Sequence, residues 1–279
     1  MSAPALSLVI AVYRQPERLR LVLEALKRQS WTDAELLVAD DGSAEDIAEL
    51  VRELRAHLPF PVRHLWHEDK GWRKNVMLNS AIREAHGAWM VFIDGDCIPH
   101  RRFLEDHAAN REEGVFLCGR RAEMSARWTA ALGVDGIRSG RFERIGPREW
   151  WEGVRGAAVR VEDALRFESP LIRRILHASP RGMLGSNFSV AREHLLAING
   201  FDEAYDGPGL GEDSDVQFRL ELLGLRAKSI RHLAIQYHMH HPRTSIPQRS
   251  KDLYEHRVAE GRMRCRLGIV HETDGGGAA

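Results

Sequence analysis

Two carboxylates that flank a glycine are the side chains of this sequence best suited to hold a metal ion. Asp94-Gly95-Asp96 directly follows the apolar run WMVFI at 89–93, and glycine permits a sharp turn there. Carboxylate oxygens suit Mg²⁺ or Mn²⁺, and such an ion could neutralise a departing diphosphate. Because aspartate is common in solvated turns, the three residues decide little until their place in the fold is known.

A second acidic group, GEDSD at 211–215, stands at the start of a helix predicted over 213–223. Acidic residues in a first helical turn complement the helix dipole, and this alone could explain Asp213 and Asp215. Alternatively, one of these carboxylates faces a cleft and acts as general base toward an attacking hydroxyl. The sequence leaves both explanations open.

Three histidines form a further candidate group after a late strand predicted over 229–237. Imidazole is a good ligand for Mn²⁺ or Zn²⁺. In an extended segment His238 and His240 share a face while His241 points away, so one of the first two could complete a site begun by Asp96. A solvated cluster is the alternative, and a structural zinc site is disfavoured because no cysteine pair lies nearby.

Continuous apolar runs predict the strands that must position these groups. Four runs precede residue 100, and stretches with helical spacing separate them. Right-handed crossovers turn this pattern into an α/β fold with a doubly wound, Rossmann-like, mostly parallel sheet. Ligands bind at the carboxyl ends of such strands, so polar residues there should form one site. The predicted strands are 6–12, 35–39, 61–66 and 89–93, and the polar strand ends are 12–14, 40–41 and 94–96.

After residue 100 the alternation weakens. Helical spacing predicts helices over 157–166, 170–177 and 248–265, whereas the rest of 119–180 follows no clean period. The glycine-rich end, 274–279, is expected to be disordered.

Composition limits the possible partners and location. Forty basic and forty acidic residues cancel, so no overall field favours nucleic acid as a partner. Three scattered cysteines fit a reducing compartment, and no stretch approaches the roughly 18 apolar residues of a membrane helix. We therefore expect a cytoplasmic protein. The basic segment 243–266 permits peripheral contact with the inner face of the membrane, although a solvated helix is the simpler explanation.

Several segments together resemble a known family. The stretch 6–43 and the later IDGDCIP at 93–99 look like a family 2 glycosyltransferase of the GT-A fold. The segments GSNFSVAREHLLAINGFDE and GEDSDVQFRLELLG are similar to the C-terminal half of the chondroitin-polymerase and β-1,4-galactosyltransferase type. The resemblance implies an inverting, Mn²⁺- or Mg²⁺-dependent glycosyltransferase. It would transfer a sugar from a nucleotide-diphosphate sugar, expected to be UDP-linked, to a saccharide or lipid-linked acceptor.

The resemblance also implies roles for matching residues. Asp96 would bind the metal directly, with His238 as its partner and His240 as second choice. Asp213 would be the catalytic base, and Glu212 would orient the acceptor or the donor sugar. The donor would be held by residues at the strand ends and one arginine beyond them. These donor contacts are Val12, Tyr13, Arg14, Asp41, Arg73, Asp94 and Gly95.

On this basis we expect one GT-A domain with an elaborated C-terminal part. Residues 1–118 would form its nucleotide-sugar-binding half, 119–245 its acceptor-binding and catalytic half, and 246–279 a basic helix with a flexible tail.

Two alternative functions remain. A sugar-phosphate nucleotidyltransferase would need a glycine-rich phosphate loop after the first strand, which 12–16 is not. A non-catalytic nucleotide-sugar-binding protein would not need both Asp96 and Asp213.

Overall fold

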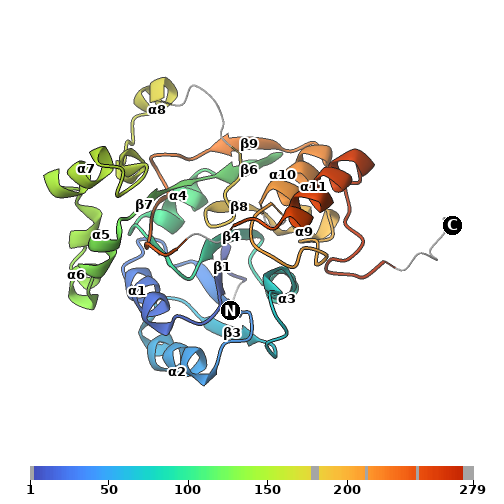
Figure 1. Cartoon of the computed structure of the whole chain (residues 1–279), viewed down its shortest axis with the longest axis horizontal. Coiled ribbons are helices and arrows are strands. Elements are labelled where there is room, and N and C mark those ends of the chain that lie inside the picture. Colours follow the sequence, from blue (N-terminus) through green and yellow to red (C-terminus); the bar gives the residue numbers. More distant parts are fainter. Residues whose placement is uncertain (1–2, 177–181, 211–212, 243–244, 273–279) are drawn as a thin grey trace.

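A mostly parallel sheet forms the centre of the molecule (Figure 1). The computed structural model describes residues 3–176, 182–210, 213–242 and 245–272, and seven strands of this part form the sheet. The sheet contains all four strands predicted before residue 100, so the predicted α/β class is confirmed. Its order is β3 (Val62–Trp66), β2 (Ala34–Asp40), β1 (Leu6–Val12), β4 (Trp89–Asp94), β8 (Phe188–Ala191), β6 (Val115–Cys118) and β9 (Arg226–Ser229).

Helices cover both faces of this sheet, because its central strands are apolar on both sides. Leu8 and Ile10 of β1 belong to a core with α1 (Pro16–Leu26) and α2 (Glu45–Leu54). Val9 points the other way, into a core with α3 (Lys74–Glu84), α9 (Arg192–Ala197) and α10 (Ser214–Leu222). The alternation of side chains along one strand thus supplies both layers.

β8 connects the strands β3, β2, β1 and β4 on one side of the sheet with β6 and β9 on the other. It lies antiparallel between β4 and β6, and it brings the second half of the chain into the sheet of the first. Phe188 of β8 pairs with Phe92 of β4, and their rings stack with centroids 4.6 Å apart. The two predicted halves therefore contribute strands to one sheet, and both contribute side chains to the core around Phe92 and Phe188.

A second sheet of three strands stands beside the ends of β1 and β4. Its order is β5 (Cys97–Pro99), β10 (Ile235–His238) and β7 (Arg120–Glu123), with β10 in the middle. The single late strand predicted over 229–237 is wrong, because β9 and β10 lie in different sheets. Between them the chain turns at His232, which has a φ of 63° and bonds the carbonyl of Leu165.

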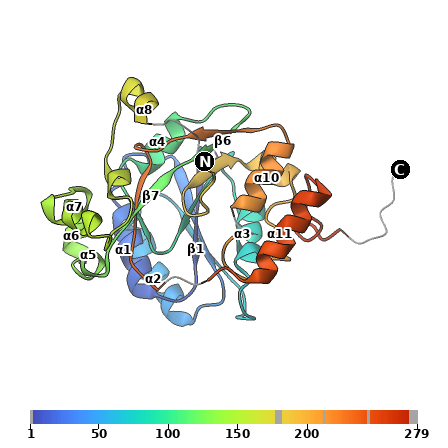
Figure 2. The same ribbon diagram turned by 45° about the horizontal axis from the view of Figure 1, so that its top comes forward.

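The region after β7 consists of short helices at one side of the molecule (Figure 2). The helix predicted over 157–166 is wrong, because Val159 pairs with the backbone of Glu123 and only a 3₁₀ turn, η3 (Val161–Ala164), follows. The helix predicted over 170–177 is present as α8. The helices of this region are α5 (Ala126–Ala130), α6 (Val134–Arg138), α7 (Pro147–Val154) and α8 (Pro170–Leu176), whereas α4 (Phe103–Ala109) lies earlier, between β5 and β6.

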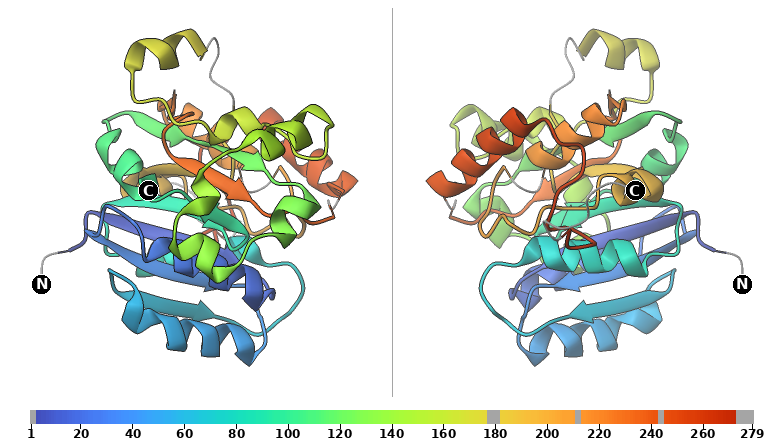
Figure 3. Two further views of the ribbon diagram at one scale, coloured as in Figure 1. Left: turned by 90° about the vertical axis from the view of Figure 1, so that its left-hand side faces the viewer. Right: turned by 90° about the vertical axis from the view of Figure 1, so that its right-hand side faces the viewer.

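The C-terminal part begins with α11 (Gln248–Glu260), as the basic segment predicted, and this helix runs beside α10 in Figures 1 and 3. After α11 the chain folds back over the body, where the buried Asn199 donates to the carbonyls of Cys265 and Val270. The predicted disordered end at 274–279 lies outside the described residues. Within the described ranges, no helix combines the length and apolarity needed to cross a bilayer.

Candidate functional site

A cleft of about 400 Å³ opens where β1 and β4 end. Its walls come from both halves of the chain, because residues after β8 and β10 face the strand ends. Most residues predicted from the sequence line it. These are Val12, Tyr13, Arg14, Asp41, Asp94, Gly95, Asp96, Asp213 and His238.

The turn after β4 sends its two carboxylates to different partners. The N–H of Gly95 donates to the carbonyl of Ala11 at 2.8 Å, which seats the turn against β1. A Cβ on Gly95 would come within 3.3 Å of Ala11 and Val12, so glycine fits this approach best. Beyond the turn, Asp94 faces two cations, whereas Asp96 faces two histidines.

Asp96 forms a close triad with His238 and His241. The Nε2 atoms of His238 and His241 lie 3.4 and 3.3 Å from Oδ2 of Asp96, and 3.2 Å from each other. Burial acts to raise the pKa of Asp96, but hydrogen bonds from the two imidazoles hold it well below its usual range. The hydrogen bond to Asp96 in turn raises the pKa of His241. Two imidazoles and a carboxylate at these separations could hold one divalent cation.

His240 does not face Asp96, which corrects the expectation that it shares a face with His238. β10 ends at His238, so the alternation of an extended strand no longer applies beyond it. The side chain of His240 is exposed, while its backbone N–H donates to Oγ1 of Thr129 and its carbonyl accepts from Arg18. These backbone contacts turn His241 toward Asp96 in its place.

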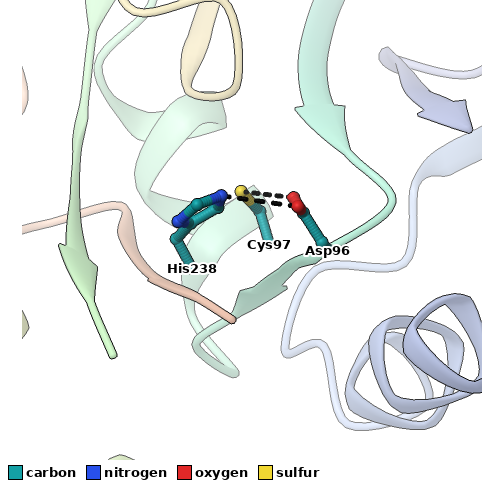
Figure 4. A group of neighbouring side chains, drawn as sticks. All are labelled: Asp96, Cys97 and His238. Atoms are coloured by element: carbon teal, nitrogen blue, oxygen red, sulfur yellow. Dashed lines mark hydrogen bonds and ion pairs between the residues drawn. The ribbon is translucent and has the colours of Figure 1, made fainter. Parts of the chain in front are cut away.

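Cys97 is a neighbour of the triad that the sequence reasoning did not include. Figure 4 shows the side chains of Asp96, Cys97 and His238 together, and their ligand atoms lie within 4.8 Å of one another. The thiol is fully buried, and this burial raises its pKa well above the usual value. A thiol held in its neutral form is a weak metal ligand, so we assign the carboxylate and imidazoles the larger share of any metal binding.

Arg73 does not line the cleft, although the sequence reasoning placed it on the phosphates. It is the N-cap of α3, and its backbone N–H donates to Oδ2 of Asp41 at 2.9 Å. Its side chain lines a separate hollow with His271. Successive residues at a helix start point in different directions, and the next one, Lys74, faces the cleft with its Nζ 2.7 Å from Oδ1 of Asp94.

Arg121 is a second cation in the cleft that the sequence did not indicate. It extends from β7 of the small sheet, and its Nη1 lies 3.9 Å from Oδ2 of Asp94 and 3.0 Å from Oγ of Ser186. The irregular pattern of 119–180 contained no signal for this position. Lys74 and Arg121 together place two positive charges beside Asp94, where a diphosphate could be held.

Asp41 and Tyr13 also line the cleft. Both oxygens of Asp41 have partners, Nε2 of His67 at 2.8 Å and the N–H of Arg73, and its burial raises its pKa. The hydroxyl of Tyr13 donates to Asp69 at 3.0 Å, and the Arg14 guanidinium stacks over the Tyr13 ring. Tyr13 keeps an exposed ring face, which suits stacking on a planar base.

The acidic group at the head of α10 divides into two roles. Asp213 is the N-cap, lines the cleft, and accepts from the N–H groups of Ser214 and Gly185. Asp215 is buried and forms an ion pair with Arg219 at 2.5 Å, which fits the structural explanation. Glu212, predicted to orient a sugar, lies outside the described residues. Of the carboxylates of this group that the structure describes, Asp213 is therefore the one placed to contact a substrate.

Solved structures of similar shape support the fold. The chain superimposes on S. aureus TarS in complex with UDP-GlcNAc with a TM-score of 0.61 and 17% identity, covering 98% of this chain and 69% of that one. For the mannosyltransferase PcManGT from Pyrobaculum calidifontis in complex with GDP-Man and Mn²⁺, the TM-score is 0.53 and the identity 19%, covering 94% and 62%. These neighbours confirm the predicted GT-A fold.

Sequence comparison extends the likeness over the whole domain. The chondroitin synthase of Escherichia coli is 26% identical over 255 residues, which is 85% of this chain and 35% of the relative. The present chain thus spans about a third of the length of that protein. The family model described as N-terminal domain of galactosyltransferase matches residues 176–242. The model for glycosyl transferase family 2 matches residues 7–156, more than half of the chain. The prediction from the sequence is therefore confirmed, and the chain belongs to glycosyl transferase family 2.

Proposed function

We propose that this protein is an inverting, metal-dependent glycosyltransferase that moves a sugar from a nucleotide-diphosphate sugar to a hydroxyl acceptor. The observation that carries the proposal is the shared cleft: Asp96 from the first half of the chain lines the same hollow as Asp213, His238 and His241 from the second half. One side offers a place for a metal ion and a diphosphate, and the other offers a base.

Asp96, His238 and His241 are the residues that would hold the metal. A divalent ion with bonds of about 2.1 Å keeps neighbouring ligand atoms roughly 3 Å apart, close to the separations of these three atoms. Bound there, the ion would neutralise the charge on the leaving diphosphate. Imidazole ligands favour Mn²⁺ over Mg²⁺, and the similar fold of PcManGT was solved with Mn²⁺.

The donor would lie along the cleft with its phosphates at Lys74 and Arg121. Both cations lie beside Asp94 within the cleft, and Tyr13, which also lines the cleft, offers a ring on which a base could stack. A UDP-linked donor is the preferred choice, because the neighbour with the higher TM-score, TarS, was solved with UDP-GlcNAc.

Asp213 would act as the general base. In one displacement, the acceptor oxygen bonds to the anomeric carbon while the bond from that carbon to the diphosphate oxygen breaks. The hydroxyl proton passes to Asp213, and the configuration inverts. Its two backbone donors hold the carboxylate in a fixed orientation for this transfer. Glu212 keeps its predicted role at the sugar, and the acceptor is proposed to be a saccharide or a lipid-linked glycan. A cytoplasmic location remains a prediction.

Nucleoside diphosphate release tests the proposal. Wild-type protein should release UDP from a UDP-sugar in the presence of Mn²⁺ and a saccharide acceptor, and chelation with EDTA should stop the release. Asp96→Ala and Asp213→Asn should each lower the rate by roughly a hundredfold or more, since each removes a group that acts on the reacting atoms. If all three proteins release the matching nucleoside diphosphate at one background rate with UDP-, GDP-, dTDP- and CDP-sugars, the proposal fails.

Two further measurements on the same proteins distinguish the alternatives. A sugar-phosphate nucleotidyltransferase would release pyrophosphate from a nucleoside triphosphate and a sugar phosphate. A non-catalytic binding protein would show a rise in melting temperature with a nucleotide sugar and no turnover with any acceptor.

A further inference from the structure

Gln236 is a buried amide that forms no hydrogen bond with its side chain. It lies in β10, the middle strand of the small sheet, and its exposed fraction is 0%. Among the described residues, neither its Oε1 nor its Nε2 has a partner. The buried amide of Asn187 is satisfied by contrast, because its Nδ2 donates to the carbonyls of Arg120 and Ala234. An unpaired buried amide lowers stability, so its presence beside the cleft requires a physical reason.

The register of the small sheet places Gln236 next to Arg121. The two residues are paired in the parallel ladder between β10 and β7, so their side chains lie on the same face of the sheet. On the other side of Gln236 the paired residue is Pro99 of β5, whose side chain carries no polar group. His238, two residues later in β10, points to this face too and belongs to the Asp96 triad. The polar side chain in register with Gln236 is therefore that of Arg121.

The guanidinium of Arg121 has an unpaired donor of its own. Its Nη1 donates to Oγ of Ser186 at 3.0 Å, whereas its Nε is buried and has no partner in the described part of the chain. Two neighbours in the sheet thus contain an unpaired donor and an unpaired acceptor. Adjacent strands lie about 4.8 Å apart and both side chains have several rotatable bonds, so Oε1 of Gln236 can reach the Nε–H of Arg121. Neither atom would give up another hydrogen bond in doing so.

We propose that Gln236 is a positioning residue for Arg121, with its amide oxygen accepting the Nε–H of the guanidinium. A guanidinium is planar, and its donors point in fixed directions within that plane. A hydrogen bond at Nε therefore fixes the edge that the group presents to the cleft, which Arg121 lines. The remaining N–H groups on the two Nη atoms can then bind phosphate oxygens through parallel hydrogen bonds. The inference rests on the proposed function, because the diphosphate of the donor is the group that Arg121 would hold.

Calorimetric titration with UDP in the presence of Mn²⁺ measures the consequence for binding. Gln236→Met keeps the approximate size of the side chain without its polar atoms. It should weaken UDP binding by roughly tenfold, the loss expected when one hydrogen bond to a charged group is removed. Lysine has no atom equivalent to Nε, so in an Arg121→Lys background the same substitution should change the affinity by less than about twofold.

Tyr237→Phe is the matched control for this titration. It also removes an unpaired buried polar atom from β10, but the Tyr237 ring points to the opposite face, into the core with Ile98 and Ala122. The control should bind UDP as wild type does. Circular dichroism and melting temperature establish that each variant is folded, and Gln236→Leu is a second apolar replacement with the same expected results.

A second measurement needs no ligand. The ¹H–¹⁵N signal of the Arg121 Nε–H is assigned by its absence from the spectrum of Arg121→Lys. Its exchange with solvent should be slow in wild type and faster in Gln236→Met at the same pH, because the hydrogen bond is lost. If wild type binds no nucleoside diphosphate, the proposed function fails, and this exchange rate still shows whether Gln236 holds Arg121.

Three outcomes would overturn the inference. The first is an unchanged exchange rate of the Arg121 Nε–H in Gln236→Met. The second is an equal loss of UDP affinity in Tyr237→Phe. The third is an equal effect of Gln236→Met in the wild-type and Arg121→Lys backgrounds, which would mean that Gln236 acts on the site by another route. A lower melting temperature of Gln236→Met with unchanged affinity and exchange would assign Gln236 to the fold alone.

Discussion

Single residues decide how the proposed metal site is composed. Asp96 sits where the sequence placed it, but the imidazole that accompanies His238 is that of His241. The backbone of His240 bonds Thr129 and Arg18, and this fixes which of two neighbouring histidines points inward. His241 therefore belongs to the proposed metal site, whereas the side chain of His240, the residue before it, is exposed to solvent.

This difference predicts the outcome of a pair of substitutions. His241→Ala should weaken binding of Mn²⁺ by at least roughly tenfold, since it removes an imidazole from the triad, whereas His240→Ala should leave the affinity unchanged. The measurement is titration of free Mn²⁺ by electron paramagnetic resonance, without nucleotide. Equal affinities in the two variants, with His238→Ala weakened, would remove His241 from the proposed site.

At the scale of elements, the first turn of α10 separates a carboxylate that lines the cleft from a buried, structural one. Asp213 caps the helix at the edge of the cleft, and Asp215, two residues on, points into the core toward Arg219. Burial raises the pKa of Asp215, and the equally buried guanidinium of Arg219 opposes that rise. The sequence could not separate the two, since both complement the helix dipole.

Stability measurements should separate them. Asp215→Asn leaves the charge of Arg219 buried without a counter-charge, and it should lower the free energy of unfolding by about 3–5 kcal/mol. Asp213→Asn keeps a good N-cap residue and should change stability by less than about 0.5 kcal/mol while activity falls. Urea unfolding of both variants is the check. Similar losses in both would show that Asp213 is also a structural residue.

At the scale of the whole molecule, distant segments close the domain. β8 inserts between β4 and β6, and β10 stands between strands from two other parts of the chain. The C-terminal segment after α11 is also held by a residue that is distant in the sequence. Asn199, at a φ of 65°, donates to Cys265 and Val270 and accepts from the N–H of Val270. One buried amide thereby holds the segment after α11 to the body.

Loss of this amide should be costly. Asn199→Ala removes three hydrogen bonds and leaves alanine at a positive φ without the side-chain hydrogen bonds that stabilise asparagine there. Stability should therefore fall by about 2–4 kcal/mol. Asn199→Gly loses the same bonds without the strain, and should be about 1 kcal/mol more stable than the alanine variant. Thermal and urea unfolding measure both. If the two variants resemble wild type, the segment is not held by this residue.

The sequence by itself determined the first four strands, the helices between them and the carboxylates at the strand ends. It could do so because these features depend on local periodicity and on one rule, that ligands bind where parallel strands end. Only the tertiary structure decided that Lys74 and Arg121 face the cleft, that His241 joins Asp96, and that the late strand divides between two sheets. In irregular segments and at helix starts, the direction of a side chain depends on contacts with residues far away in the chain. No local pattern records those contacts.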